Sequence, residues 1–288
     1  MAGETILVAG CGYVGSALAA RLVGKGDRVF GLSRSPRELP EGVQPIAADL
    51  ADPACGRMLP EPLDRVFYTA AADDGSEAAY RRAYVDGLGN LLTALEARRR
   101  PPRRVLFTSS TSVFQQSDGS WVDEASPTEP GHHRGRVMLE AEARLTRSPL
   151  VCVALRLGGI YGPGRTRLLE SVRAGRAAYD SRGPRYTNRI HRDDAASALV
   201  HLARLPQPAP LYLGVDDDPA DRAALLRWLA RRLGAPEPRA EAGSGLLDAG
   251  KRCRNERLRA SAWAPAFPSY RDGYAAMLEG SATGVQPK

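Results

Sequence analysis

The chain of 288 residues has few cysteines and no long apolar run. The cysteines are scattered without paired spacing, which argues against a zinc site and a disulfide framework; they are Cys11, Cys55, Cys152 and Cys253. No run of about 18 apolar residues is present, so we expect no membrane span. The first apolar run is short and ends in glycines, which indicates a core strand rather than a signal peptide. These features predict a cytoplasmic protein.

Lysine is also scarce, and the net charge of +7 comes almost entirely from arginine. The arginines are interleaved with Asp and Glu along the chain. The one short block, Arg98–Arg100, precedes Pro101–Pro102, where cations favour the C-terminus of a helix. We therefore expect no nucleic-acid partner. A hydrophobic content of 43% and a charged content of 25% are ordinary for a globular protein of one large domain or two modest ones.

The first 34 residues contain a strand–turn–helix–strand pattern. The apolar run Thr5–Ala9 leads into the glycine-rich segment Gly10–Gly15, an amphipathic segment Ser16–Val23 follows, and a second apolar run covers Arg28–Leu32. This construction is typical of a dinucleotide-binding turn, in which the helix N-terminus receives the pyrophosphate. The alternative is a glycine-rich turn without a ligand.

Each glycine of this turn has a distinct expected role. Gly10 permits the tight turn, Gly12 lets the backbone approach the phosphates, and Gly15 lets the helix pack closely on the strand. The helix would start at Tyr13 and Val14, whose amides would face the anion. We therefore expect all five residues to bind the coenzyme.

The end of the second strand lacks the carboxylate that usually accepts from the ribose 2′-OH of NAD. It carries Ser33 and Arg34 instead, and a guanidinium is suited to a phosphate. Ser35 and Arg37 could add hydrogen bonds. This predicts NADP(H) rather than NAD(H), with a solvated loop arginine as the alternative.

Apolar runs alternate with helical patterns through the first two-thirds of the chain. Fully apolar strands between helices predict an α/β fold, a Rossmann-type doubly wound parallel sheet. The segment 115–134 reads as a loop. The further strands expected are Val43–Ala47, Arg65–Ala71, Arg104–Ser110, the continuous apolar run Leu150–Leu157, and Leu211–Val215, and the helices are Ser76–Ala97 and Gly135–Leu145.

The pattern changes after Gly158. We expect a dinucleotide-binding domain over residues 1–160, to which residues 190–215 return, and a smaller C-terminal substrate lobe over 161–189 and 216–280. The lobe contains one clear helix, Asp221–Leu233. Asp193 and Asp194 are expected to cap a helix that begins near Ala195. Residues 281–288 are expected to be a tail, with fraying from Gly280.

The order of motifs resembles the extended short-chain dehydrogenase/reductase family, which includes nucleotide-sugar epimerases and dehydratases. The resemblance covers nearly the whole chain. It implies that Asp49 and Leu50 contact adenine, and that Ala70 and Ala71 flank the riboses of the coenzyme. It also rests on the strand end Thr108–Phe114, on Leu155–Gly164, which would reach toward the nicotinamide, and on Arg189–Asp194, which would return from the substrate lobe.

The chain departs from this family at its catalytic pair. The family carries a tyrosine and a lysine spaced Y-x-x-x-K, followed four residues later by a glutamate. Glu140 matches the glutamate, which places Arg136 at the lysine and His132 at the tyrosine. No tyrosine lies between Tyr84 and Tyr161, so the resemblance implies an atypical active site.

Three residues remain as catalytic candidates. Ser110 could polarise a carbonyl, a role that Thr111 could share, or the two hydroxyls could simply end a strand. Arg136 can bind ribose hydroxyls but stays protonated; alternatively it pairs with Glu140 at i, i+4. His132, or His133 if the register slips, could donate the proton, or it could be a loop histidine.

Several residues beyond the sheet are secondary candidates. His191 and Tyr161 are either site residues or structural ones, and Tyr186 could face the substrate. The nearby arginines either recognise an anionic substrate or belong to an ordinary solvated loop; they are Arg165, Arg167, Arg182 and Arg185.

The sequence therefore predicts an NADP(H)-dependent oxidoreductase or epimerase-like enzyme acting on a small carbonyl or sugar-nucleotide-like substrate, without a metal. The alternative is an NADP(H)-binding sensor or regulatory protein without turnover, which the loss of the Tyr–Lys pair favours. The resemblance further implies a homodimer, since the helices carrying Tyr84 and Glu140 form a four-helix interface in family members.

Overall fold

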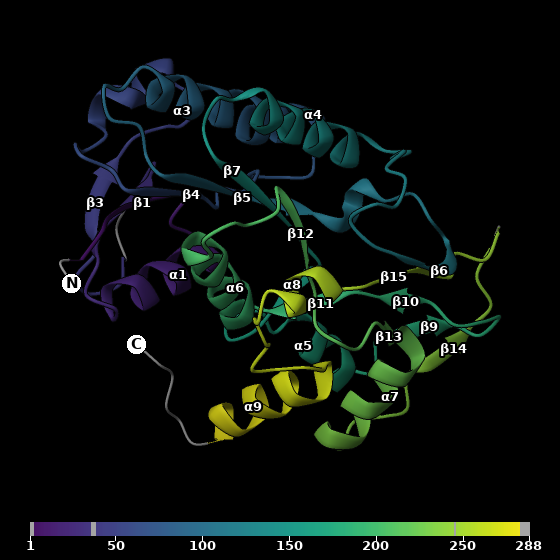
Figure 1. Ribbon diagram of the computed structural model, residues 1–288. Helices are drawn as coiled ribbons and strands as arrows, with labels where there is room; N and C mark the ends of the chain where they lie inside the picture. The colour runs from purple at the N-terminus through teal and green to yellow at the C-terminus, as the bar shows by residue number, and fades with distance from the viewer. Residues whose placement is uncertain (1–2, 36–38, 245, 283–288) are drawn as a thin grey trace. The chain divides into compact units, whose positions relative to one another are not determined.

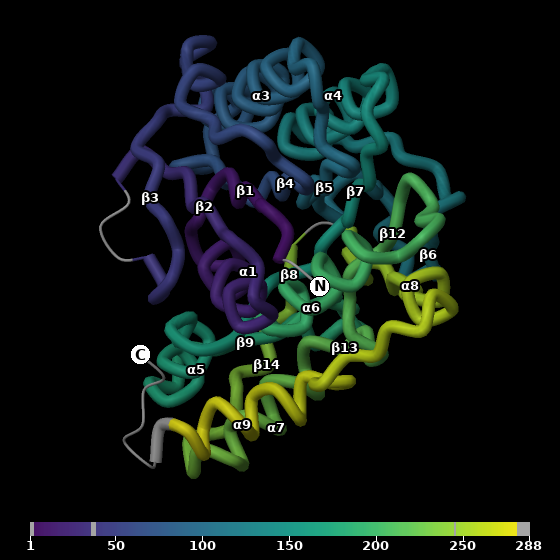
Figure 2. The backbone as a smooth tube through the Cα atoms, turned by 60° about the vertical axis from the view of Figure 1, so that its left-hand side comes forward, coloured from purple at the N-terminus to yellow at the C-terminus, as the bar shows by residue number. Residues whose placement is uncertain are grey.

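A seven-stranded sheet forms the centre of the computed structural model, which describes residues 3–35, 39–244 and 246–282. The strand order is β12-β7-β5-β4-β1-β2-β3, which Figure 2 shows from right to left. The six strands from β7 to β3 pair in parallel. The strands are β1 (Thr5–Ala9), β2 (Arg28–Ser33), β3 (Gln44–Ala47), β4 (Arg65–Tyr68), β5 (Arg104–Ser110), β7 (Cys152–Leu157) and β12 (Leu211–Gly214).

Helices cover both faces of this sheet (Figure 1). Helices α3 and α4 lie over one face, and α1 and α6 lie over the other. This is the Rossmann-type α/β arrangement that the apolar strands predicted. The elements are α1 (Tyr13–Val23), the 3₁₀ segments η1 (Pro53–Met58) and η3 (Thr111–Val113), α2 (Glu77–Tyr80), the π-helical segment η2 (Arg81–Asp86), α3 (Gly87–Glu96), α4 (His133–Arg147) and α6 (Arg192–Arg204).

The sheet forms because its central strands are apolar on both faces. In β1, Ile6 to Ala9 are fully buried, and β5 and β7 are buried over most of their length. A strand covered by helices on both sides has no exposed face that would favour alternating polar residues. The continuous apolar runs in the sequence are the direct consequence.

The chain divides into two compact units. The first comprises Met1–Gln115, Pro127–Leu157 and Ala195–Tyr212, and it contains most of the central sheet. The second comprises Gln116–Ser126, Gly158–Asp194 and Leu213–Lys288.

The second unit is built from small sheets and short helices. A four-stranded sheet has the order β13-β10-β15-β6, and two further strand pairs are β8 with β11 and β9 with β14. The strands are β6 (Asp118–Val122), β8 (Gly159–Tyr161), β9 (Ala178–Asp180), β10 (Tyr186–Thr187), β11 (Arg189–His191), β13 (Ala220–Asp221), β14 (Arg239–Glu241) and β15 (Gly250–Cys253). The helices are α5 (Arg167–Arg173), α7 (Arg222–Leu233), α8 (Glu256–Ala260) and α9 (Tyr270–Ala282).

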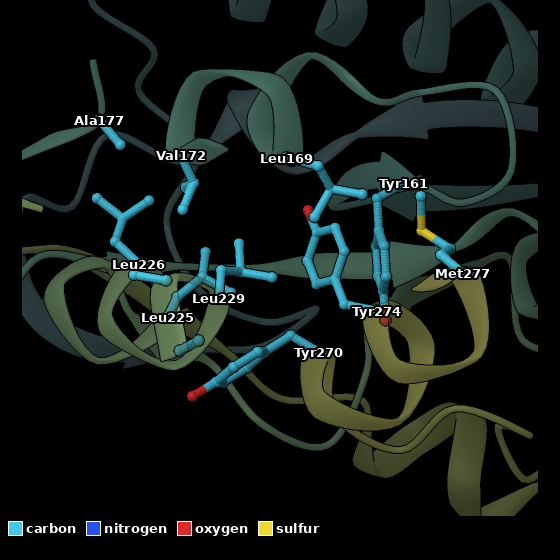
Figure 3. Packing of buried hydrophobic residues seen from close by; sticks show 12 residues of the cluster. Tyr161, Leu169, Val172, Ala177, Leu225, Leu226, Leu229, Tyr270, Tyr274 and Met277 are labelled. Carbon is cyan, nitrogen blue, oxygen red and sulfur yellow. The ribbon is translucent and has the colours of Figure 1, made fainter. Parts of the chain in front are cut away.

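Helix α7 anchors an apolar core in the second unit (Figure 3). Its leucines pack with α5, α9 and Tyr161. The helix begins where the Asp221 carboxylate accepts from the Ala224 amide at 3.2 Å, and it ends at Gly234 with φ of +60°. The sequence predicted this helix because its aspartate start and glycine end are typical caps.

Three local predictions were wrong. The expected loop 115–134 contains β6, which pairs with the distant β15. Asp194 does not cap α6, because the helix already begins at Arg192 and the Asp194 carboxylate accepts from the amides of Ala266 and Phe267. Gly280 lies within α9 rather than in a frayed tail. The rest of the predicted tail, residues 283–288, lies outside the described residues.

All four cysteines are free thiols. Burial raises the pKa of Cys152 to about 11, so its thiolate is disfavoured at neutral pH. Within residues 3–35, 39–244 and 246–282, no cluster of His, Cys, Asp and Glu could hold a metal ion. No helix in that part of the chain has the length and the apolar character needed to cross a membrane.

Leu91 offers a test of the core, because its side chain is completely buried in α3. We expect Leu91→Ala to lower the free energy of unfolding by about 2–5 kcal/mol, since it removes buried methyl groups and leaves a cavity. Urea denaturation followed by circular dichroism measures this. Leu246→Ala, at a side chain that is 96% exposed, is the control and should leave stability within about 0.5 kcal/mol. Equal effects of the two changes would contradict the assigned core.

Candidate active site

The turn after β1 brings its first glycine against the end of β4. Gly10 has φ of +90°, and a Cβ atom built on it would lie 2.2 Å from the amide nitrogen of Ala70. A Cβ atom on Gly15 would meet the carbonyl oxygen of Gly10 at 2.4 Å. Only glycine fits these two positions. The tight turn and the close helix–strand packing are those of a dinucleotide-binding turn.

Gly12 faces open space instead. No atom lies within 4 Å of a Cβ atom built on it, and as the N-cap of α1 it has no side chain to occupy the amides of the first turn. The first helical residues are Tyr13 and Val14, at the positive end of the helix dipole. A pyrophosphate fits this cradle, because the backbone at Gly12 can be approached closely.

Neighbouring strands hold the turn in place. The amides of Gly10 and Cys11 both donate to the carbonyl oxygen of Leu32 in β2, at 2.8 and 3.1 Å. The hydroxyl of Thr69, just after β4, donates to the Gly10 carbonyl at 2.8 Å. Ala70 and Ala71 follow directly, and Ala71 is exposed. The predicted ribose-flanking turn therefore lies beside the glycine turn, at the carboxyl edge of the parallel sheet.

Asp49 and Leu50 follow β3 at the same edge. The Asp49 carboxylate accepts from the Ala51 amide at 2.9 Å and from Arg82 at 2.5 Å. The amide and the guanidinium hold the pKa of Asp49 below its ordinary value. Leu50 is buried, and its carbonyl oxygen accepts from the Asn90 side chain at 3.0 Å. Both residues are thus held in fixed positions.

Arg34 follows the last residue of β2, Ser33, and forms a two-pronged ion pair with Asp73. Its Nη1 and Nη2 atoms donate to the two carboxylate oxygens at 2.7 and 2.5 Å. The guanidinium lowers the pKa of Asp73. Ser35 is exposed, while Arg37 lies outside the described residues. Asp73 was not predicted from the sequence, because its partner Arg34 is 39 positions away.

Ser110 is the last residue of β5. Its hydroxyl oxygen accepts from the Ser112 amide at 3.1 Å and thereby caps the 3₁₀ turn η3. Ser110 is half-buried, whereas Thr111 is buried. The start of α4 packs against this turn, since a Cβ atom on Gly135 would lie 2.6 Å from the Ser112 carbonyl oxygen. The structure therefore brings the Ser110 turn and the segment from His132 to Arg136 together.

His132 is the N-cap of α4. Its Nδ1 atom accepts from the Gly135 amide at 3.2 Å, so the proton of the neutral ring lies on Nε2. His132 is exposed. His133 is placed differently, because its Nε2 atom lies 2.9 Å from the Gly75 carbonyl oxygen and its ring meets Tyr80 edge-on.

Arg136 is exposed on the first turns of α4. Its Nη1 atom donates to the Gly131 carbonyl at 3.2 Å. It does not pair with Glu140, as one interpretation of the sequence expected, because Glu140 binds Arg81 of η2 through two hydrogen bonds of 2.8 and 3.0 Å. The π-helical segment η2 packs against α4 and carries Arg81 toward it.

A buried ion pair between β7 and α4 was not predicted from the sequence. Arg156 in β7 donates to both oxygens of Glu142 in α4 at 2.9 and 2.7 Å, and the Ser109 hydroxyl donates to the same carboxylate at 2.6 Å. Arg156 is only 5% exposed and lies over the Phe114 ring. The run Leu150–Leu157, which was expected to be continuously apolar, therefore contains a buried charged residue, Arg156. A single charged residue in an otherwise apolar run is the sequence feature that could have indicated this ion pair.

Tyr161 and His191 lie inside the second unit, in contact with each other. Their rings meet edge-on with centroids 5.4 Å apart, and Tyr161 also packs on Tyr274, as Figure 3 shows for the tyrosines. His191 is 2% exposed and packs against Phe267. Burial raises the pKa of Tyr161. Both are core residues of that unit.

A buried carboxyl group near this cluster was also missed. Asp216 is 2% exposed, and burial raises its pKa to about 8, although the guanidinium of Arg189 opposes the shift. The sequence feature that could have indicated it is the triple aspartate Asp216–Asp218, which follows β12 and Val215. Which of the three aspartates is buried depends on tertiary packing and could not be predicted from the sequence.

Three of the four arginines proposed for an anionic substrate have partners within the second unit. Arg182 pairs with Asp180 at 2.6 Å, and Arg185 pairs with Asp248 at 2.9 Å. Arg165 donates to the Ile160 carbonyl at 2.9 Å. Tyr186 stacks against the guanidinium of Arg252 at 4.7 Å.

Comparison with known proteins gives the family. The model of the NAD-dependent epimerase/dehydratase family matches residues 6–210. The chain belongs to this family. The motif order that resembled extended short-chain dehydrogenases/reductases is thereby confirmed, and the family depends on nicotinamide dinucleotides.

Individual relatives and solved structures are similar to this chain over nearly its full length. A Streptomyces protein named 3-diazoavenalumate denitrifying reductase is 29% identical over 301 residues, which cover 93% of this chain and 98% of that relative. A protein from Methylobacillus flagellatus described as an NAD-dependent epimerase/dehydratase has a solved structure with a TM-score of 0.82 and 37% identity, covering 97% of this chain and 99% of that one. MoeE5, solved in complex with UDP-glucuronic acid and NAD, shares the fold with a TM-score of 0.78 at 21% identity, covering 98% of this chain and 100% of that one.

Gly12 allows a test of the cradle that does not disturb folding. We expect Gly12→Val to weaken binding of both pyridine coenzymes by more than about tenfold, because the side chain would fill the open space before the α1 amides. Calorimetric titration with NADPH and NADH measures this, and thermal unfolding checks the fold. Gly24→Ala at the other end of α1, where a Cβ atom has its nearest neighbour at 3.4 Å, is the control. Undiminished binding by Gly12→Val would rule out this cradle.

Proposed function

We propose that this chain is an NADP(H)-dependent oxidoreductase or epimerase-like enzyme that acts on a small carbonyl or sugar-nucleotide-like substrate. The residues proposed to hold the coenzyme are the glycine turn with Tyr13 and Val14, the pair Asp49–Leu50, the turn Ala70–Ala71, and Ser33 with Arg34. When bound, NADP(H) would supply or accept the hydride. The reductase name of the Streptomyces relative supports the redox reaction, and the UDP-glucuronic acid bound to MoeE5 is one example of a substrate that the fold accommodates.

The observation that carries the choice of coenzyme is the guanidinium of Arg34 at the end of β2. An NAD-preferring site places a carboxylate there to accept from the ribose 2′-OH. A planar guanidinium instead offers two parallel donors to a phosphate. That Arg34 already holds a carboxylate through both outer nitrogens supports the proposal, because it presents a fork of the required shape.

The proposed catalytic residues are Ser110, His132 and Arg136. The Ser110 hydroxyl would donate to the substrate oxygen, a role compatible with its accepting the Ser112 amide. Arg136 uses one of its five donors on Gly131, so others can bind the ribose hydroxyls that the family's lysine would bind. Since a guanidinium stays charged, Arg136 would position the ribose and not move a proton.

His132 would supply the proton or hydrogen bond of the missing tyrosine. With Nδ1 accepting from Gly135, the ring presents Nε2–H to its surroundings. In this state it can donate a hydrogen bond to a substrate oxygen, as a neutral imidazole does in other enzymes. Full protonation of the ring would remove the acceptor that caps α4, so proton transfer is coupled to the stability of the helix start.

Coenzyme binding without turnover is the second candidate function. The N-cap role of His132 favours it, because that role explains the histidine without any chemistry. The two functions separate when the protein is given NADPH labelled with deuterium on the nicotinamide and a panel of carbonyl compounds. Deuterium in a product supports the enzyme, and binding without any transfer supports the sensor.

We expect Arg34→Ala to weaken NADPH binding by about ten- to a hundredfold, because the loss of a bidentate phosphate contact to a charged group is worth about 1.5–3 kcal/mol. NADH binding should change by less than about threefold. Competitive calorimetric titration of both coenzymes measures the two constants. A wild-type preference for NADH would contradict the proposed coenzyme, and an equal loss for both coenzymes would contradict the assignment of Arg34.

The role of His132 is tested with two variants. We expect His132→Asn to lower kcat by about a hundredfold or more, because asparagine cannot transfer a proton. Asparagine is nevertheless a good N-cap, so this variant should unfold like the wild type, whereas His132→Ala should lose about 0.5–2 kcal/mol of stability. Rates measured against pH with unfolding curves separate the two roles. Wild-type rates in His132→Asn would leave His132 as a helix cap alone.

A further inference from the structure

The fork of Arg34 is engaged by a carboxylate of the same chain. Both outer nitrogens of Arg34 donate to Asp73, one to each oxygen, at 2.7 and 2.5 Å. A phosphate on a ribose would use the same two parallel donors, because guanidinium binds carboxylate and phosphate in the same fork geometry. Asp73 and a 2′-phosphate therefore compete for one set of donors.

The ion pair reaches across the glycine turn. Arg34 follows β2 and Asp73 follows β4, and the sheet order places β1 between these two strands. All three strands are parallel, so their carboxyl ends share one edge. The pair thus joins the segments that follow the two strands on either side of β1, at the edge where coenzymes bind in open parallel sheets.

A second ion pair completes the local balance of charge. Arg82 binds Asp49 at 2.5 Å, and each carboxylate also feels the other pair's guanidinium, which helps to lower its pKa. The two arginines and two aspartates sum to zero formal charge. From these four described side chains, a phosphate dianion meets no net positive charge unless one of the two carboxylates moves away.

The Asp73 carboxylate can separate from its arginine more easily than the Asp49 carboxylate can. The Asp73 and Arg34 side chains are 54% and 56% exposed, so an ion pair between them is weak and water can replace it. Asp49, with an exposed fraction of 33%, is also held by the Ala51 amide. Asp73 is therefore the carboxylate that a 2′-phosphate would displace.

We propose that Asp73 is the residue that sets the selectivity between NADP(H) and NAD(H), by occupying the phosphate fork of Arg34 as an internal substitute for the 2′-phosphate. This inference rests on the proposed coenzyme function. NADH carries no 2′-phosphate and leaves the Arg34–Asp73 pair intact, whereas NADPH must break it. Asp73 thus lowers the affinity for NADPH alone, and it keeps the guanidinium in place when no phosphate is bound.

The test is the affinity of Asp73→Asn for NADPH, for NADH and for the fragment 2′,5′-ADP, by calorimetric titration. We expect the dissociation constants of NADPH and 2′,5′-ADP to fall about three- to fivefold, which is as much as an exposed ion pair usually contributes. The NADH constant should stay within about twofold. In an Arg34→Ala background, Asp73→Asn should bring no gain, because the fork is gone.

Asp74→Asn is the matched control. It removes the same charge from the neighbouring position of the same loop, but Asp74 accepts from the Ser76 amide at 2.7 Å and not from Arg34. The inference would be overturned if Asp74→Asn raised the affinity for NADPH as much as Asp73→Asn does, or if the gain persisted in the Arg34→Ala background. Either result would show a general effect of charge. Unchanged or weaker NADPH binding by Asp73→Asn would also overturn it.

The same titrations separate this inference from the proposed function. If the wild type prefers NADH but Asp73→Asn still gains NADPH affinity, the proposed coenzyme is wrong and the selectivity role of Asp73 stands. If the wild type prefers NADPH and Asp73→Asn gains nothing, the coenzyme stands and the role of Asp73 fails. If no variant binds either coenzyme, both fail.

Discussion

The main-chain anchoring of one turn determines where everything else in the candidate site lies. Two amides of the turn converge on the Leu32 carbonyl of β2, and the Thr69 hydroxyl after β4 binds the Gly10 carbonyl. Because Ala70 lies against the bare α-carbon of Gly10, no side chain separates the turn from β4. The ends of three strands are thereby held at one edge, and the residues that follow each strand become neighbours.

Charge at this edge is organised in pairs rather than as a basic surface. Arg34 with Asp73, Arg82 with Asp49, and Arg81 with Glu140 each join two segments distant in the sequence. The pairs are exposed and individually weak, so they adjust to a ligand more readily than a buried pair would. The buried pair of Arg156 with Glu142 has the opposite character, because breaking it would leave a charge in the protein interior. The exposed pairs can therefore exchange a carboxylate for a ligand, while the buried pair of Arg156 and Glu142 stays intact.

Most of the sheet could be predicted from the sequence because its strands are buried on both faces, which leaves continuous apolar runs. Strand β6 was not predicted because it is short and partly polar. Its partner β15 lies about 130 residues later, and no local pattern in the sequence indicates that the two strands pair. The π-helical segment Arg81–Asp86 was not predicted, because the apolar spacing of the surrounding helix continues through it. Asp194 was expected to cap α6, but it binds amides from the distant segment Ala266–Phe267, which only the fold brings near.

By itself, the sequence determined the α/β class and the glycine turn, and it predicts that His132 and Arg136 stand where the family carries its tyrosine and lysine. These features are local, because they depend on backbone conformation, burial period and residue identity along one stretch of chain. The tertiary structure alone decided which groups those side chains meet: Asp73 for Arg34, the Gly135 amide for His132, Gly131 for Arg136 and Arg81 for Glu140. Hydrogen-bond and ion-pair partners depend on distances of a few ångströms between segments, and those distances are fixed only when the sheet and its helices have packed.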